Sequence, residues 1–291
     1  MPELPEVESA RAVIERSALA RVIAHVDDTD TWECRPHAPG EIRDALLGRR
    51  LVAAHRRGKT LWVETSGSDA PVLGIHLGMS GRILVSAPSG GVDEGGDYVG
   101  MRPQRTPLKP QWDRFTVTFE DGGALRLFDK RRLGRVRLDP DIDALGPDAG
   151  EVRLPAFRDL LGRSHTAVKA RLLDQHAVAG IGNLLADETL WQAAVAPEQP
   201  ADELDPDEVA RLHRELRKAI RSAIRHGGVH TGEIIEHRKA GDHCPRCGAP
   251  MRRTVAGGRT TWACSVEQPA PSVTPARPSP SRLGPWTPTP S

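Results

Sequence analysis

The stretch DQHAVAGIGNLLADETLW, residues 174–191, indicates the fold most directly. A helical segment ends before Gly180 and Gly182 and another begins at Asn183, which is the layout of a helix-turn-helix unit. The glycines leave the turn without side chains, so backbone N–H groups and the positive end of the second helix can face a phosphate. Asn183 can equally be the cap of that helix and nothing more. The residues alone leave both interpretations open.

More helices are expected on both sides of this stretch. FRDLLG (157–162), TAVKARLLDQ (166–175) and residues 205–228 have helical character, and the last segment repeats apolar residues at helical spacing. Gly227–Gly228 predicts where that long helix stops. The second half of the chain is therefore predicted to be helical.

The first half of the chain has a different pattern. Short β-like runs separated by Gly, Pro and Asp predict a sandwich or barrel. Residues 89–111 interrupt these runs and are predicted to be a long loop, and residues 139–150 have the composition of a linker. The predicted strands are residues 21–28, 50–55, 60–66, 71–78, 81–87, 114–121 and 124–129.

Composition limits the class of protein. The 291 residues are 38% hydrophobic and 27% charged, as in ordinary globular proteins, and suffice for two modest domains and an appendage. No run approaches the roughly 18 apolar residues of a membrane span, and the acidic N-terminus lacks a secretory layout. We therefore expect a cytoplasmic protein without a membrane partner.

Basic residues gather locally although the net charge is only +1. Residues 126–137, RLFDKRRLGRVR, hold six basic side chains against the single acid Asp129. Local clusters of this kind make the electrostatic footprint of nucleic-acid binding. A solvated charged strand or turn is the alternative.

The N-terminus, MPELPEVES (1–9), combines prolines and acids. Pro5 suits the first turn of a helix, acids near that end favour the helix dipole, and apolar residues from Val7 onward form a helical stripe. A helix does not explain the pair Pro2–Glu3.

Three of the four cysteines lie close together, at Cys244, Cys247 and Cys264. In a reducing compartment this spacing indicates a metal site, and it resembles a zinc ribbon in which Glu267 stands where a fourth cysteine is expected. A Cys₃Glu site, a Cys₃His site using His243, or a hairpin held by packing alone are all consistent with the residues. Gly257–Gly258 predicts a hairpin with Arg259 at its tip, suited to a nucleic-acid groove or simply solvated.

In their order along the chain, MPELPEVE, RRGK, HLGMSG, FDKRRLG, GIGN and the cysteine hairpin resemble the formamidopyrimidine-DNA glycosylase/endonuclease VIII family. The resemblance covers about residues 1–268 and is closest to the formamidopyrimidine-DNA glycosylase branch. It implies an α+β fold with an N-terminal β-sandwich flanked by helices, a helix–two-turns–helix domain and a zinc-finger-like β-hairpin. The implied domains are 1–138, a linker 139–152, 153–239 and 240–268, followed by a disordered Pro-rich tail, 269–291.

The resemblance also implies a function. Members excise oxidised or ring-opened bases from duplex DNA and then cut the abasic site by β- and δ-elimination, so a bifunctional glycosylase/lyase that binds damaged double-stranded DNA is expected. A monomer with one structural Zn²⁺ is expected as well. By position, Pro2 would be the nucleophile after removal of Met1, Glu3 its acid/base partner, and Lys59 and Arg259 further catalytic groups. The implied DNA contacts are Met79, Arg131, Leu133, Lys169 and Asn183.

The sequence departs from the family pattern at a few positions. Leu133 replaces a usual phenylalanine wedge, Lys130 replaces a usual proline, and Glu267 replaces a zinc cysteine. The segment 227–243 is shorter than the corresponding loop in 8-oxoguanine-cleaving relatives. Oxidised pyrimidines, ring-opened purines and abasic sites therefore remain alternative substrates, and a weakly catalytic damaged-DNA binding protein is a second functional alternative.

Overall fold

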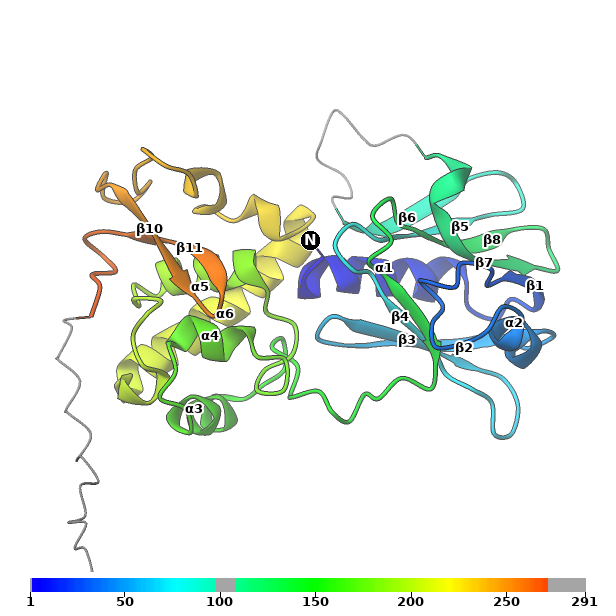
Figure 1. The fold of residues 1–291 in the computed structure, drawn as a ribbon, viewed down its shortest axis with the longest axis horizontal. Helices are drawn as coiled ribbons and strands as arrows, with labels where there is room; N and C mark the ends of the chain where they lie inside the picture. Colours follow the sequence, from blue (N-terminus) through cyan, green and yellow to red (C-terminus); the bar gives the residue numbers. More distant parts are fainter. Residues whose placement is uncertain (1, 98–107, 272–291) are drawn as a thin grey trace, which may run out of the picture.

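The computed structural model describes residues 2–97 and 108–271. Figure 1 shows two lobes, one built from β-sheets and one from helices, with the first helix starting at the junction between them. This arrangement confirms the predicted α+β class. Most of the predicted tail, from residue 272 on, and residues 98–107 of the predicted long loop lie outside the described residues.

The first lobe is a sandwich of two antiparallel sheets. The first sheet has the strand order β1-β7-β8-β5-β6, and the second has the order β2-β3-β4-β9. Alternate residues of the strands point inward, which is the usual core pattern of such sandwiches. The strands are β1 (Ile23–Asp27), β2 (Leu51–Arg57), β3 (Thr60–Thr65), β4 (Leu73–His76), β5 (Arg82–Ser86), β6 (Val92–Gly96), β7 (Asp113–Phe119), β8 (Ala124–Phe128) and β9 (Arg135–Leu138).

Helix α1 (Leu4–Ser17) contacts strands of both sheets. Its buried stripe of Val7, Ala10, Val13 and Ile14 belongs to the sandwich core, as the helical periodicity predicted. Its first residue, Leu4, instead packs into the core of the helical lobe. The start of α1 therefore joins the two lobes.

The second lobe contains the predicted helices and a hairpin. Gly227 ends the long helix α6 in the left-handed conformation, as predicted, and the tip of the hairpin is Gly257–Gly258. No helix in the described part of the chain is long and apolar enough to span a membrane. The elements are α3 (Leu154–Gly162), α4 (Val168–Leu173), α5 (Asn183–Gln192), α6 (Pro206–His226), β10 (Met251–Ala256) and β11 (Arg259–Cys264), with 3-10 turns at Ala201–Glu203, Val229–Thr231 and Ile235–His237.

The structure corrects the predicted loop at 89–111. Residues Val92–Gly96 form β6, the edge strand beside β5, and a 3-10 turn occupies Pro110–Trp112. A Cβ at Gly95 would lie 2.4 Å from the carbonyl oxygen of Ser9, so only glycine lets this strand approach α1. Helix α2 (Glu41–Leu46) and strand β9 were not predicted as elements.

Candidate active site at the junction of the two lobes

Glu3 is fully buried between the lobes, and its carboxylate binds the N-terminus of α5. Its oxygens accept hydrogen bonds from the backbone N–H groups of Gly182 (2.9 Å), Leu184 (2.9 Å) and Leu185 (3.0 Å). Burial raises the pKa of Glu3, while the charge of Lys59 and these N–H groups act in the opposite direction. A carboxyl held in this way can exchange a proton without moving.

The predicted phosphate site at the turn is therefore already occupied by this carboxylate. The N-cap residue is Gly182 rather than Asn183, so the capping interpretation of Asn183 is wrong, while its predicted contact with a DNA phosphate stays a prediction. The Asn183 side chain instead donates to the carbonyl oxygen of Thr260, 3.2 Å away on β11. It links the start of α5 to the hairpin strand that carries Arg259.

Glycines make room for this contact. A Cβ at Gly182 would lie 2.2 Å from the carboxyl carbon of Glu3, and one at Gly58 would lie 2.6 Å from the Cβ of Ala179. Gly180 has a φ of 113°, which side chains rarely adopt. The β2–β3 turn and the helical turn can therefore meet directly against the N-terminal residues.

Glu6 fixes the backbone next to Glu3. Its carboxylate accepts hydrogen bonds from the N–H of Glu3 (2.9 Å) and the N–H of Val229 (2.7 Å). The side chain is buried, and burial raises the pKa of Glu6 to about 7. Sequence reasoning had assigned Glu6 only a favourable charge at the helix start, because Val229 lies far along the chain.

Lys59 follows Gly58 at the β2–β3 turn. Its ammonium donates to the carbonyl oxygen of Ile181 at 2.8 Å. Burial lowers the pKa of Lys59, the charge of Glu3 raises it, and the charge of Arg259 lowers it further. The structure thus brings Lys59, Glu3 and Arg259 into one electrostatic site, and Arg259 itself is exposed at the hairpin tip.

Lys169 does not lie at the surface, contrary to the predicted phosphate contact. Its side chain is fully buried, with the ammonium 2.6 Å from Asp187 and 2.7 Å from the hydroxyl oxygen of Thr261. Asp187 also accepts a hydrogen bond from Arg238 at 2.8 Å. This network joins α4, α5, the segment after α6 and the hairpin.

The three residues predicted to fill a gap in DNA lie on two neighbouring loops. Asp129 holds both loops, because its carboxylate accepts hydrogen bonds from the Ser80 hydroxyl at 2.6 Å and from three backbone N–H groups of residues 131–134. Asp129 is fully buried, whereas Met79, Arg131 and Leu133 are exposed. The structure brings the predicted wedge residues together on a fixed support.

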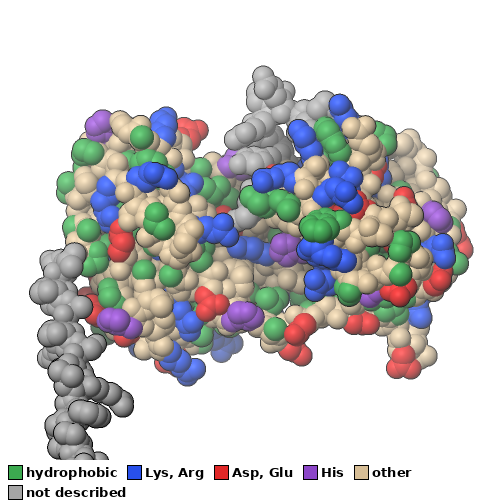
Figure 2. All heavy atoms as spheres, viewed as in Figure 1, with side chains coloured by type: hydrophobic (Ala, Val, Ile, Leu, Met, Phe, Trp, Pro, Cys, Tyr) green, Lys and Arg blue, Asp and Glu red, His purple; other side chains and the backbone are tan. Residues whose placement is uncertain are grey.

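Cationic side chains surround these loops. The residues that line an open groove in the sandwich include Thr60, His76, Leu133, Arg135 and Arg137. Thr60 directly follows Lys59 in the sequence. Figure 2 shows Lys and Arg side chains gathered on this face, next to the hollow between the lobes. The basic cluster predicted from residues 126–137 therefore includes exposed charge on the face where the lobes meet.

The cysteine cluster forms as the spacing predicted. The possible ligand atoms of Cys244, Cys247 and Cys264 all lie within 4.8 Å of one another, so the three thiols could hold a metal ion. Glu267 and His243, the two predicted fourth ligands, are not part of this cluster.

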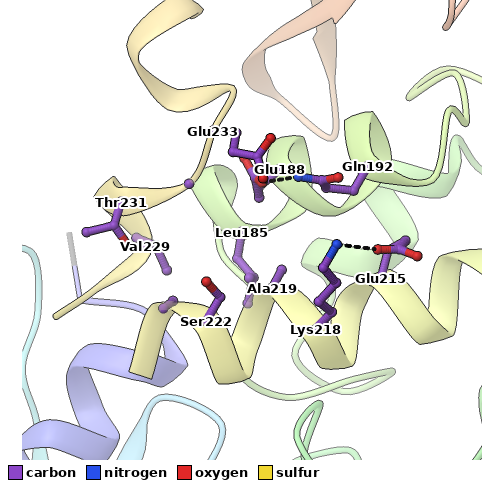
Figure 3. Close-up of a pocket in the computed structure, with 12 residues that line it drawn as sticks. Leu185, Glu188, Gln192, Glu215, Lys218, Ala219, Ser222, Val229, Thr231 and Glu233 are labelled. Atoms are coloured by element: carbon purple, nitrogen blue, oxygen red, sulfur yellow. Dashed lines mark hydrogen bonds and ion pairs between the residues drawn. The ribbon is translucent and has the colours of Figure 1, made fainter. Parts of the chain in front are cut away.

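A small cleft lies beside the segment that follows α6. Figure 3 shows it between α5, α6 and residues 229–233, with Glu188 bonded to Gln192. Its volume is about 60 Å³, far below the roughly 300 Å³ at which ligand pockets begin. Glu188 also accepts from the N–H of Ile234 at 3.0 Å, so this cleft marks where the short segment is anchored.

Two lobes that meet at a basic, hollowed junction, with a helix-turn-helix unit and a cysteine hairpin in one of them, define a nucleic-acid-binding protein. Comparisons with known sequences make the class specific. The profile of the Formamidopyrimidine-DNA glycosylase N-terminal domain matches residues 1–136, and that of the Formamidopyrimidine-DNA glycosylase H2TH domain matches residues 144–233.

Whole-chain relatives agree with these profiles. Formamidopyrimidine-DNA glycosylases of a Nocardioides species and of Streptomyces coelicolor are 35% and 34% identical, over 93% and 94% of this chain and 95% and 100% of theirs. The Lactococcus lactis enzyme, solved with DNA containing an abasic site, superimposes with a TM-score of 0.75 at 27% identity, covering 92% of this chain and 99% of its own.

The chain belongs to the formamidopyrimidine-DNA glycosylase family. It is a DNA glycosylase of base-excision repair that acts on damaged double-stranded DNA, and its family couples base removal to abasic-site cleavage.

Proposed function

We propose that Pro2 is the nucleophile of this glycosylase and that Glu3 is its acid/base partner. The observation that carries the proposal is the placement of residues 2–6. They are buried at the junction of the lobes, with the Glu3 carboxyl locked on α5 and its pKa raised. This placement fixes the N-terminal residues at the point where both lobes meet, which supports a role for them in the reaction.

The chemistry follows from the residue types. Removal of Met1 turns Pro2 into a secondary amine, and terminal amines have a pKa of about 8, low enough for a reactive fraction near neutrality. Attack of this nitrogen on the sugar C1′ displaces the damaged base, which leaves with the proton lost from the proline nitrogen. Protonation of the ring oxygen then breaks its bond to C1′ and leaves a covalent iminium. Glu3 supplies a proton to the sugar ring oxygen and later moves protons during elimination.

Lys59 and Arg259 supply positive charge around the same centre. A lysine with a lowered pKa can donate a proton or bind a phosphate, and the exposed Arg259 can enter a groove of the duplex. The lesion must leave the base stack to reach Pro2. We propose that Met79, Arg131 and Leu133, on the loops that Asp129 holds, fill the gap that the lesion leaves in the base stack.

The range of lesions follows from two features. Leu133 fills space but cannot stack on a base as an aromatic ring does. The short segment 227–243 is held by Glu6, Glu188 and Asp187. Solved complexes of relatives contain DNA with an oxidised pyrimidine for the Lactococcus lactis enzyme and with carbocyclic 8-oxo-G for MutM. We propose that the short, anchored segment gives little selectivity between damaged bases, so 8-oxoguanine, ring-opened purines and oxidised pyrimidines are removed at comparable rates.

The cysteine cluster fits a structural zinc ion. Three thiolates are soft ligands that zinc accepts, and the cluster lies at the base of the hairpin whose tip is Arg259. We propose that Cys244, Cys247 and Cys264 hold one zinc ion, which would fix the base of this hairpin. Since the substrate is cellular DNA, we also propose a cytoplasmic location.

Borohydride trapping tests the proposed nucleophile. The wild-type protein should form a covalent adduct with abasic duplex DNA, and Pro2→Gly should weaken or abolish it. Pro5→Gly is the matched control, because Pro5 lies in the same segment but inside α1. Mass spectrometry of the intact chain should show that Met1 is absent. An adduct of equal yield from Pro2→Gly at another residue would exclude Pro2 as the nucleophile.

A further inference from the structure

The three thiols of the hairpin lie close together, and two of them accept hydrogen bonds from N–H groups. The sulfurs of Cys247 and Cys264 are 3.4 Å apart, and N–H groups point at two of the three sulfurs. The indole N–H of Trp191 donates to Cys244, and the backbone N–H of Glu267 donates to Cys264, each at 3.3 Å. Donors of this kind orient metal ligands and stabilise their thiolate forms.

The carboxylate of Glu267 is paired with a guanidinium and is not part of the thiol cluster. Its oxygen lies 2.8 Å from the guanidinium of Arg246. That guanidinium is fixed in turn by the Trp191 ring, 4.0 Å away, and by the side-chain oxygen of Gln192 at 3.3 Å. Glu267 therefore has a partner that is itself held in place.

The other nearby donors do not complete the site. Gln268 is buried and uses its amide on the N–H of Cys264 and the carbonyl oxygen of Val195. His243 is exposed, and the fourth cysteine, Cys34, is buried in the sandwich core. Within residues 2–97 and 108–271, the cluster of possible ligands around these sulfurs contains three cysteines and nothing else.

We propose that this hairpin binds zinc through three thiolates and leaves the fourth position to an exchangeable ligand from solvent. The inference rests on the zinc binding proposed above and deepens it. A site of this kind is open to small thiols, which a closed four-cysteine site excludes. The backbone at position 267 lies next to the cluster, since its N–H donates to the sulfur of Cys264.

X-ray absorption of the zinc-loaded full chain tests the ligand set. In thiol-free buffer the wild-type protein should show three sulfur atoms at about 2.3 Å and one oxygen or nitrogen at about 2.0–2.2 Å. Adding 2-mercaptoethanol should replace the light atom by a fourth sulfur. Glu267→Ala and His243→Ala should keep the same spectrum and the same zinc affinity in chelator competition.

Glu267→Cys should close the site. It should show four sulfur atoms without added thiol and bind zinc at least about tenfold more tightly, a scale that even indirect ligand changes reach. A tenfold loss of affinity in Glu267→Ala or His243→Ala, together with a light atom that 2-mercaptoethanol displaces in that variant but not in the wild type, would identify a protein ligand and overturn the open site, while zinc binding itself would stand. A wild-type spectrum that 2-mercaptoethanol leaves unchanged would also overturn it. A full chain that takes up no zinc would overturn both proposals.

Discussion

Glu6→Gln tests how the buried carboxyl of Glu6 links stability to pH. Burial raises the pKa of Glu6 from 4.5 to about 7, and the residue is 3% exposed. A difference of this size corresponds to about 3 kcal/mol, since each pKa unit is worth about 1.4 kcal/mol. Below pH 4.5 the carboxyl is protonated in both the folded and the unfolded state, so it does not lower the free energy of unfolding. As pH rises toward 7 the unfolded state ionises first, so stability is lost and the loss is complete above pH 7.

The measurement is urea unfolding of the wild-type protein and of Glu6→Gln at pH 5 and pH 8. Glutamine stays neutral, so the wild-type free energy of unfolding should fall by about 2–3 kcal/mol relative to the variant over this range. In the variant, the NH₂ group of glutamine faces one of the two backbone N–H donors and cannot accept its hydrogen bond. This lowers the free energy of unfolding by about 1 kcal/mol at every pH. The pKa of Glu33 is also raised to about 7, but Glu33 is present in both proteins and cancels.

Glu15→Gln on the exposed end of the same helix is the matched control for removing a carboxylate from α1. A difference between wild type and Glu6→Gln that is constant from pH 5 to pH 8 would refute the reasoning. It would mean that Glu6 is ionised at both pH values, with the N–H groups of Glu3 and Val229 outweighing its burial.

Three further substitutions test the site. Gly182→Ala should push the Glu3 carboxyl from its place and reduce the single-turnover rate of base excision by about 100-fold or more, as ångström-scale misplacement can. Gly162→Ala, which has open space around it, should leave that rate unchanged. Asp129→Ala should reduce excision of an intact lesion more than trapping on abasic DNA, because an abasic site needs less help to leave the stack. Lys169→Met removes one partner of a buried ion pair and should lower the free energy of unfolding by about 3–5 kcal/mol; unchanged urea unfolding would contradict it.

The local patterns of the sequence were sufficient for most of the fold. Period-two runs predicted seven strands, and Gly257–Gly258 predicted the hairpin turn, because these signals depend on near neighbours. Strand β6 was missed because VDEGG has neither alternation nor β-branched residues beyond Val92. Its glycines indicate a loop locally, yet Gly95 is required by the tertiary contact with α1.

The site was harder to predict because its contacts connect distant parts of the chain. Resemblance to a family supplied the positions of Pro2, Glu3 and Lys59, but no pattern predicted that Glu3 would occupy the end of α5. The resemblance implied that Lys169 contacts DNA, and no local pattern predicted that its side chain would be fully buried. Its burial depends on Asp187, and a pairing of that kind appears only when α4, α5 and the hairpin meet.

The contact between Glu3 and α5 also bears on the acid/base role proposed for Glu3, because it fixes a carboxyl whose pKa is raised. A carboxylate at a helix N-terminus ordinarily has a lowered pKa, because N–H groups and the helix dipole favour its charge. Here burial outweighs those groups, so the pKa of Glu3 is raised and the carboxyl can carry a proton to the sugar. The same N–H groups that hold Glu3 in place act against burial and favour the charged form of its carboxyl. The glycine turn at residues 180–182 was predicted to bind a phosphate of DNA. The N–H of Gly182 in this turn, with those of the first turn of α5, binds the carboxylate of Glu3 instead.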